Sequence, residues 1–389
     1  MTDPTDHLLQ WCLQDGVRMA GPEALIAGFA RACHAVGVSV DRIAVTMRTL
    51  HPQLAALGWV YQADRPFEAR QYGARARMTD AYAHSPIRLL RERQATRIHL
   101  PLQGENIDRF PIARDLHEDG FTDYLALALV IGEERDDGVE QRHFATLATR
   151  APQGFTLGCV EALERVMAAF ALLLDRFALQ TIARNVCETY IGRNTGRRVL
   201  AGQIHRGAID TVRAAVWFSD LRGFTRRTQK LGSQGTVDLL NQWFDVVGEA
   251  VTAEGGEILK FIGDAALVIF PVDERGPSDA CARALRGAQR TLRGVEGLDT
   301  PDGEPITFGV GLSLGEVGYG NIGAADRLDF TVIGHTVNVA ARLEGLCAAT
   351  GEAVLTSDEF AAAIGSPMRS VGAHALKGVD APMAVFAPE

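Results

Sequence analysis

The sequence predicts a two-domain protein, with an α+β domain first, then a helical linker, and then an α/β domain. Three observations support this fold class. In residues 1–155, helical and strand-like patterns are mixed between charged and glycine-rich loops, which is typical of an α+β domain. Residues 156–205 form a nearly continuous helical pattern. In residues 206–389 strands alternate with helices, as in an α/β domain with a covered sheet.

Composition and charge exclude several classes of protein. The chain has 389 residues, too many for one typical domain, and 47% of them are hydrophobic, which is ordinary for globular proteins. The net charge of −9 argues against a general nucleic-acid binder. An anionic ligand must therefore be held by local basic groups or by a metal ion.

The cysteines and the apolar runs predict a cytoplasmic protein that does not enter a membrane. The six cysteines include no CxxC pair, which argues against a disulfide framework or a zinc site and favours a reducing compartment. The N-terminal residues lack the basic-then-apolar order of a signal peptide. The longest fully apolar run, residues 166–174, is far shorter than the roughly 20 residues of a membrane span.

The linker carries an apolar seam that allows two interpretations. Its members recur at alternating steps of four and three residues, and they are Leu163, Met167, Phe170, Leu174 and Phe177. This spacing is that of a two-stranded coiled coil, although the seam fails at Thr181. The helix is therefore either a dimer stalk or a helix packed on its own domain.

The elements that we expect around this linker follow from patterning. In the first domain they are a helix over residues 22–37 and strands over 41–50, 123–132 and 142–150. In the second domain they are a strand over 214–218, a hairpin over 255–270, strands over 306–315 and 328–334, and helices over 236–253, 278–294 and 336–350.

Two aspartates mark the ends of apolar strands in the second domain. Asp220 follows the first strand, and Asp264 lies at the tip of the hairpin. The hairpin places its tip beside the end of that strand, so we expect the two carboxylates to meet at one edge of the sheet. Because a buried carboxylate needs a partner, the pair predicts a site for two Mg²⁺ ions that serves phosphoryl or nucleotidyl transfer. The alternative is that each aspartate is only a turn residue.

The turn after Asp220 predicts a phosphate-binding site. Gly223, Phe224 and Thr225 place backbone N–H groups at the start of a helix, and helix starts bind anions.

Three separated blocks make the second domain resemble a known family. They are FSDLRGFT at 218–225, GGEILKFIGDAALVIF at 255–270 and DFTVIGHTVNVAARLE at 329–344, followed by a closing segment LKGVDAPMAVF at 376–386. Their order and spacing resemble the class III adenylate/guanylate cyclase catalytic domain over residues 212–387. The resemblance implies a ferredoxin-like fold and an active site across a homodimer interface. Asp220 and Asp264 would bind two Mg²⁺ or Mn²⁺ ions, with the Leu221 carbonyl assisting.

The resemblance also implies roles for three later residues. Asn338 orients the ribose, and Arg342, four residues on along the same helix face, neutralises the charge that grows on the α-phosphate. A planar guanidinium suits a transferring phosphoryl group better than a point charge does. Lys377, in the closing segment, matches a basic residue that holds the terminal phosphates.

Lys260 and Thr331 indicate ATP as the substrate. In the family, adenylate cyclases carry a lysine at the position of Lys260, just before the hairpin tip, and an aspartate or threonine at the position of Thr331. Guanylate cyclases carry glutamate and cysteine at these two positions. A lysine donates to adenine N1, while guanine presents a donor there. Threonine at 331 resembles a mostly bacterial subgroup. A guanylate cyclase, or a degenerate nucleotide-binding signalling module, stays as the alternative.

The first domain resembles a GAF-like sensor in the order of its elements and in its place ahead of a cyclase domain. This likeness implies regulation by a small-molecule effector, whose identity the sequence does not give. Seven histidines are candidate haem ligands, although a given histidine is more often a surface or core residue. They are His7, His34, His51, His84, His99, His117 and His143.

Overall fold

The computed structural model describes residues 3–48, 54–73, 79–92, 95–130, 142–203, 205, 207–324, 326–378 and 381–389. It divides into two compact units, Met1–Val186 and Cys187–Glu389, called here the N-terminal unit and the C-terminal unit. His51 and the predicted strand ends at 49–50 and 131–132 lie outside the described residues, as do 379–380 of the closing segment.

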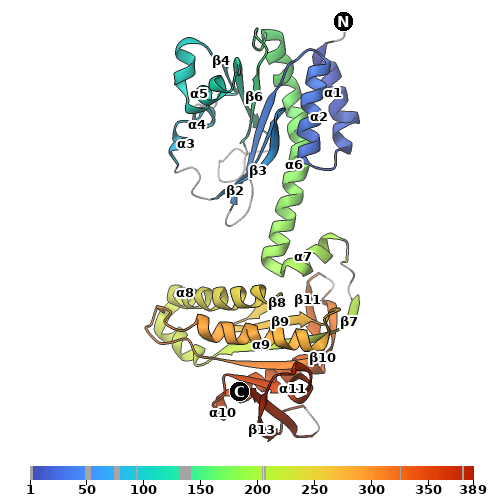
Figure 1. Cartoon of the computed structure of the whole chain (residues 1–389), viewed down its shortest axis with the longest axis vertical. Helices are drawn as coiled ribbons and strands as arrows, with labels where there is room; N and C mark the ends of the chain where they lie inside the picture. The colour runs from blue at the N-terminus through green and yellow to red at the C-terminus, as the bar shows by residue number, and fades with distance from the viewer. Residues whose placement is uncertain are drawn as a thin grey trace. The chain divides into compact units, whose positions relative to one another are not determined.

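The N-terminal unit, which carries the labels α1 to α6 in Figure 1, is built on a six-stranded antiparallel sheet. The strand order is β3-β2-β1-β6-β5-β4. The strands are β1 (Arg42–Arg48), β2 (Leu54–Gln62), β3 (Arg65–Gly73), β4 (Arg97–Pro101), β5 (Asp123–Val130) and β6 (Arg142–Thr149). The helices are α1 (Pro4–Gln14), η1 (Gly16–Arg18), α2 (Pro22–Ala35), α3 (Asp80–Ala83), α4 (Pro86–Glu92), η3 (Gly104–Arg109), α5 (Pro111–Glu118) and α6 (Leu157–Ile191).

Each face of this sheet has its own apolar core. Helices α1, α2 and α6 cover one face, where Phe29 and Phe170 stack with ring centroids 4.2 Å apart. Helices α4 and α5 cover the other face, around Phe121 and Tyr124. The mixed helix and strand patterns of the sequence therefore reflect a sheet that is covered on both sides.

The seam of α6 belongs to the first of these cores. Its five members, Leu163, Met167, Phe170, Leu174 and Phe177, are all buried against the N-terminal unit. The interpretation as a helix packed on its own domain is therefore confirmed for this seam. The helical pattern predicted over 156–205 is also interrupted, because Gly192 (φ 90°, ψ 155°) separates α6 from the next helix, α7 (Arg193–Leu200).

The C-terminal unit alternates strands and helices as predicted. After α7 its elements are β7 (Ile209–Leu221), α8 (Phe224–Ala253), β8 (Glu257–Ile262), β9 (Ala265–Pro271), α9 (Gly276–Gly294), β10 (Phe308–Gly323), β11 (Leu328–Ile333), α10 (His335–Thr350), β12 (Val354–Ser357), α11 (Asp358–Ile364), β13 (Met368–His374) and β14 (Met383–Pro388). Helix α8 is longer than the predicted 236–253 and is interrupted at Gly232 (φ 65°, ψ −175°).

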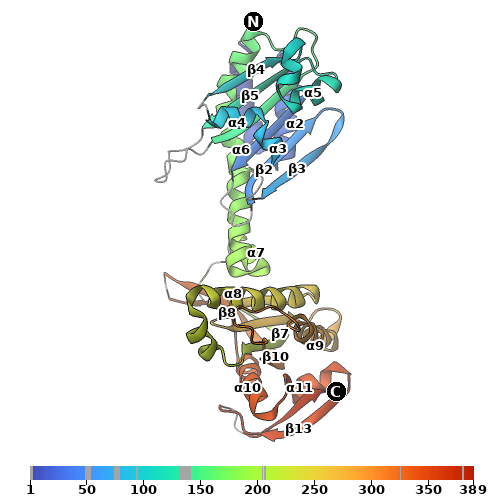
Figure 2. The ribbon, with the colours of Figure 1, turned by 90° about the vertical axis from the view of Figure 1, so that its left-hand side faces the viewer.

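The sheet of this unit has a ferredoxin-like centre. The succession β7-α8-β8-β9-α9-β10 gives the strand order β10-β7-β9-β8, and β12, β14 and β13 extend the β10 edge. Helices α8 and α9 lie side by side on one face (Figure 1). Helix α10 packs on the opposite face, below the strands in Figure 2. Helices therefore cover both faces of the sheet, and the ends of its strands are the places where a functional site can form.

Candidate active site

The first candidate residue, Asp220, lies at the end of a buried strand. The residues before it, Ala214 to Trp217, are fully buried in β7 because they face the two cores of the sheet. Asp220 pairs with Gly309 of β10. A side chain at Gly309 would lie 2.7 Å from Glu344 Oε1 of α10, so this glycine leaves room for a third carboxylate near Asp220.

The second candidate, Asp264, lies in the turn between β8 and β9, where the sequence predicts it. The indole Nε1 of Trp243 on α8 donates to the Asp264 carbonyl at 2.9 Å and holds the turn against the sheet. Antiparallel pairing of β7 with β9 runs up to Ser219 and Ala266, so the turn lies beside the end of β7. The expected meeting of the two aspartates is thus what the fold produces.

The neighbouring carboxylates perturb Asp220. Burial raises the pKa of Asp220 well above its usual range, and the adjacent Asp264 and the charge of Glu344 raise it further. Burial and the Asp264 charge also raise the pKa of Glu344. Asp220 Oδ1 is buried and has no hydrogen-bond partner among the described residues. A place where carboxylates crowd and one oxygen lacks a donor suits a cation.

A divalent metal fits this donor set. Within the described ranges, no group of three or more His, Cys, Asp or Glu side chains forms a ready-made metal cage. Mg²⁺ commonly uses one or two carboxylates and takes its other ligands from water and substrate phosphates. Asp220 and Asp264 match this pattern. The side chain of Leu221 has no atom that can ligate a metal ion, so this residue could assist only through its backbone carbonyl.

The turn after β7 leads directly into α8. Gly223 adopts a left-handed conformation (φ 69°, ψ 18°), and a side-chain carbon at this position would meet no described atom within 4 Å beyond its chain neighbours. Phe224 and Thr225 begin the helix, whose first N–H groups have no partner within the helix itself. One turn on, Arg227 anchors this start through a bidentate pair with Asp302 at 2.8 and 2.6 Å. An open helix start beside two carboxylates can receive a phosphate.

The two residues expected to read the base lie on neighbouring segments of the same unit. Lys260 is on β8 and Thr331 is on β11. Lys260 Nζ donates to Asp329 Oδ2 of β11, a contact that the sequence does not reveal. Lys260 and Asp329 both line a hollow of about 1120 Å³. Thr331 Oγ1 is buried and lacks a partner among the described residues.

The residues expected to act on the ribose and phosphates lie on the outer surface. Asn338 and Arg342 are exposed on α10, opposite the side on which Val339 and Leu343 are buried. Lys377 is also exposed, in the segment between β13 and β14. Within one chain, therefore, the sheet edge gathers the two aspartates and the helix start, whereas α10 presents Asn338 and Arg342 to solvent.

Two carboxylates near the site are missed by sequence reasoning. Glu344 ends the block at 329–344 and Asp329 opens it, but the sequence pattern assigns neither residue a role. Glu344 becomes relevant because α10 crosses Gly309, and Asp329 becomes relevant because β11 approaches β8. Both contacts join residues far apart in the sequence, so no local pattern signals them.

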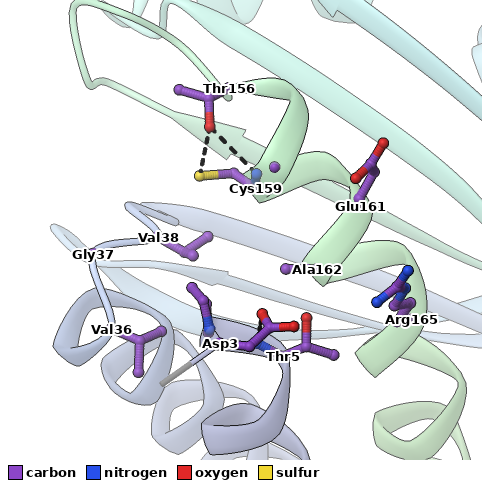
Figure 3. A pocket seen from close by; sticks show the side chains of 12 residues that line it. Asp3, Thr5, Val36, Gly37, Val38, Thr156, Cys159, Glu161, Ala162 and Arg165 are labelled. Carbon is purple, nitrogen blue, oxygen red and sulfur yellow. Dashed lines mark hydrogen bonds between the residues drawn. The ribbon is translucent and has the colours of Figure 1, made fainter. Parts of the chain in front are cut away.

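The N-terminal unit contains a smaller hollow of about 350 Å³ (Figure 3). It is lined by the N-terminal ends of α1 and α6 and by the segment after α2, including Asp3, Cys159 and Arg165. The Thr156 hydroxyl donates to Cys159 Sγ at 3.2 Å and accepts from the Cys159 N–H at 3.3 Å. Elsewhere in the unit, His99 Nε2 lies 2.9 Å from Asp123 Oδ2, so this histidine has a protein partner. In neither unit is any described helix long and apolar enough to cross a bilayer.

Comparisons with known proteins identify the second half of the chain. Residues 208–383 match the family described as the adenylate and guanylate cyclase catalytic domain. The chain is 33% identical over 174 residues to an adenylate cyclase of Anabaena cylindrica, a match that covers 42% of this chain and 33% of that protein. It is 33% identical over 156 residues to the terminal-differentiation specific adenylate cyclase of Dictyostelium discoideum, covering 39% of this chain and 7% of that protein. The chain thus spans a third or less of the length of these relatives.

Among solved structures, the chain is similar to the adenylyl cyclase CyaB of P. aeruginosa, with 29% identity and a TM-score of 0.38, over 46% of this chain and 94% of that one. The family match over 208–383 includes the β7 end, the β8–β9 turn and α10. The C-terminal half of the chain is therefore a class III adenylate/guanylate cyclase catalytic domain.

Proposed function

We propose that the protein is an adenylate cyclase, which converts ATP into 3′,5′-cyclic AMP and pyrophosphate as a homodimer. The observation that carries this proposal is the pair of crowded carboxylates, Asp220 and Asp264, beside the open start of α8. When bound there, two Mg²⁺ or Mn²⁺ ions would supply Lewis-acid activation of the ribose 3′-hydroxyl and neutralise charge at the α-phosphate.

The chain's own residues position the triphosphate. The first N–H groups of α8, at Gly223, Phe224 and Thr225, bind phosphate oxygens at the positive end of the helix. Arg342 stabilises the charge that develops on the α-phosphate as pyrophosphate leaves, and Lys377 binds the terminal phosphates. These roles are carried over from the family resemblance, and the exposure of both basic side chains is compatible with them.

Asn338, Lys260 and Thr331 complete the nucleotide site. Asn338 holds the ribose so that its 3′-oxygen is in line with the bond to the leaving pyrophosphate. Lys260 donates to adenine N1, and the unpartnered hydroxyl of Thr331 accepts from the adenine amino group. Guanine offers a donor and an acceptor in the reverse arrangement, so this pair favours ATP over GTP.

A homodimer joins the separate halves of this site. The metal-binding aspartates lie at the sheet edge, whereas Asn338 and Arg342 point away from the sheet on α10. The C-terminal unit also exposes large apolar side chains that a partner would cover, among them Phe261 (45% exposed), Ile262 (49%) and Ile333 (47%), on β8 and β11. We therefore assign the aspartates of one subunit and the arginine of its partner to each active site.

The N-terminal unit is assigned as a GAF-like sensor for a small molecule. What supports this is a six-stranded antiparallel sheet covered by helices on both faces, placed ahead of the cyclase domain. The hollow of about 350 Å³ beside α6 is large enough for a small ligand. Helix α6 runs from this unit to the start of the C-terminal unit. A ligand that orders one end of the helix can therefore change the order of the other end.

The test is turnover of each nucleotide by the purified full chain. We expect cyclic AMP from ATP with Mn²⁺, and at least about tenfold less cyclic GMP from GTP, since one buried mismatched hydrogen bond has about this effect. The Asp264→Ala variant is the matched control and should form neither product. Predominant cyclic GMP would make the protein a guanylate cyclase. No product from either nucleotide, with the protein folded, would make the domain a degenerate one.

A further inference from the structure

Asp329 holds the charged end of Lys260. The Lys260 Nζ, on β8, donates to Asp329 Oδ2, on β11. The lysine side chain is 28% exposed and the aspartate side chain is 62% exposed, so both partners remain partly accessible to solvent. The two strands are not hydrogen-bonded to each other in the sheet. Side-chain contacts such as this one therefore bring them together.

The position of Asp329 on β11 places it beside the predicted base-reading threonine. Asp329 pairs with Ile322 of β10 and Thr331 pairs with Gly320, so the two residues are two positions apart on one strand. Side chains at this spacing point to the same face. The Thr331 hydroxyl is buried without a partner among the described residues. An ammonium donor, a carboxylate acceptor and an unpartnered hydroxyl therefore share one side of β11.

The contact with Asp329 limits the mobility of Lys260, which would otherwise make this lysine a poorly selective hydrogen-bond donor. Its stem is long and flexible, so a free ammonium group samples many positions and can donate to almost any acceptor. An ammonium group has three N–H donors. Using one of them for Asp329 fixes the nitrogen in place and leaves two for a ligand. A fixed donor discriminates between bases better than a mobile one, because it cannot move away from a mismatched group.

We propose that Asp329 is a positioning residue for nucleotide selection, which holds Lys260 beside Thr331 so that its remaining N–H groups meet adenine N1. The proposal rests on the proposed function of this site and assigns to it a residue that the family resemblance leaves without a role. The Asp329 carboxylate acts through the lysine. It does not touch the reacting phosphate or the attacking oxygen.

A stability effect alone would not support the proposal. An ion pair between side chains as exposed as these contributes little to folding, so removing Asp329 should leave the thermal midpoint of unfolding nearly unchanged. The informative quantity is the ratio of affinities for adenine and guanine nucleotides. We would measure equilibrium binding of 3′-deoxy-ATP and 3′-deoxy-GTP to the full chain with Mg²⁺. These analogues lack the attacking hydroxyl, so binding is read without turnover.

The expected result is a wild-type preference for the adenine analogue that falls by about tenfold in Asp329→Ala, the effect of one well-placed hydrogen bond. Asp329→Glu keeps a carboxylate and should recover part of the preference. Asp326→Ala removes an exposed acid from the preceding loop and should bind both analogues as the wild type does. Wild-type preference in Asp329→Ala, or no adenine preference in the wild type, would overturn the proposal.

A double-mutant cycle separates positioning from direct contact with the base. In a Lys260→Ala background, Asp329→Ala should cause no further change in the affinity ratio, because its effect passes through the lysine. An equal, additive loss in that background would overturn the positioning role. Failure of the proposed function would give a different result. A wild-type protein that binds 3′-deoxy-ATP selectively but forms no cyclic AMP from ATP would contradict the cyclase assignment. The positioning role of Asp329 in nucleotide selection would then still stand.

Discussion

Asp220 is a half-buried acid whose neighbours are other acids. Burial, Asp264 and Glu344 all disfavour its charged form, and one of its oxygens has no hydrogen-bond partner among the described residues. Without a cation, this arrangement opposes folding, because a buried carboxylate is costly unless it is paired. A divalent ion reverses the sign of the interaction. We therefore expect the same two side chains, Asp220 and Asp264, to bind a divalent ion.

The first prediction concerns metal binding at this pair. Mn²⁺ or Mg²⁺ should raise the thermal midpoint of the C-terminal unit, since an ion that binds only the folded state stabilises it. Asp220→Asn and Asp264→Asn should each lose this rise and reduce cyclic AMP formation by about a hundredfold or more, the scale for losing a preorganised charge at a reacting centre. Circular dichroism should show an intact fold. Metal-dependent stabilisation that persists in either variant would place the ions elsewhere.

The second prediction concerns the buried ion pair at the start of α8. The side chains of Arg227 and Asp302 are 3% and 1% exposed. The Arg227 guanidinium lowers the pKa of Asp302 from its ordinary value of 3.8 to about 2. A depressed acid pKa adds stability that is complete above the unfolded value and disappears as the pH falls through the folded value. The contribution should therefore be full at pH 7 and lost as the pH falls from about 4 to about 2.

Replacement of the acid tests this pH window. Asp302→Ala leaves a buried arginine without its carboxylate partner, which costs about 3–5 kcal/mol. Urea unfolding of the variant at pH 7 should show this loss, and the difference from the wild type should shrink toward pH 2. The exposed pair between Arg275 and Asp273 offers a matched control, because solvent screens this pair and Asp273→Ala should lower the stability far less than Asp302→Ala does. A difference that stays constant from pH 7 to pH 2 would contradict the assignment.

At the scale of elements, helix α6 has two apolar stripes, and the described residues cover only one of them. The predicted seam through Leu174 is buried in the N-terminal unit. A second series, Leu172 (60% exposed), Leu179 (56%) and Val186 (38%), lies outside this core at intervals of seven residues. Residues seven positions apart lie on nearly the same side of a helix, and a two-stranded coiled coil uses this repeat. We therefore expect this stripe to pack against the same helix of a second subunit.

Our third prediction uses one variant on each stripe. Leu174→Asp should unfold the N-terminal unit, because it buries an unpaired charge. Leu179→Asp should leave the circular dichroism unchanged and weaken self-association of the full chain, measured by sedimentation. Gln180→Asp adds the same charge to the neighbouring exposed position and serves as the control. Equal dimer affinity in Leu179→Asp and Gln180→Asp would show that the stripe is not part of the interface.

The elements that the sequence predicts correctly have local signals. The fully apolar run before Asp220 becomes β7, the glycine before Asp264 marks the β8–β9 turn, and the four-residue spacing of Asn338 and Arg342 places both on the outer face of α10. Strand β3 escapes prediction because it is a sheet edge and mostly exposed, which removes the alternation of apolar residues that predicts strands.

Contacts between distant segments have no such signal. Glu257 of β8 accepts hydrogen bonds from Thr195 of α7 and Tyr319 of β10, at 3.3 and 3.1 Å. In the sequence it is one acid after two glycines. The sequence leaves the covering of α6 open for the same reason, since periodicity shows that a face is apolar but not what covers it.

At the scale of the whole molecule, the candidate site residues lie on different elements and faces of one subunit. Asp220 and Asp264 are at the end of the sheet that faces the start of α8. Thr331 pairs with Gly320, eleven positions along β10 from Gly309, the partner of Asp220. Two subunits in a closed, two-fold arrangement would place the metal-binding edge of each against the α10 face of the other, giving two equivalent sites.

The fourth prediction follows from this arrangement. Asp220→Ala and Arg342→Ala should each be inactive as homodimers, because every site then contains one lesion. After mixing and subunit exchange, a mixed dimer contains one site with both lesions and one site with neither. At equal amounts and with random pairing about half of the dimers are mixed, so activity should approach roughly a quarter of the wild-type value. The measurement is cyclic AMP formation before and after exchange.

Two controls make this result decisive. Asp220→Ala mixed with Asp264→Ala should stay inactive, because both lesions affect the same half of the site and every site in the mixed dimer keeps one of them. Exchange itself can be followed by labelling the two variants with different fluorophores and recording energy transfer between them. If labels exchange fully while the Asp220→Ala and Arg342→Ala mixture stays at zero, each chain builds its active site alone. In that case α10 of the same subunit would have to turn its outer face toward the edge that carries Asp220 and Asp264. The burial of Val339 and Leu343 against β12 and β14 opposes this rearrangement.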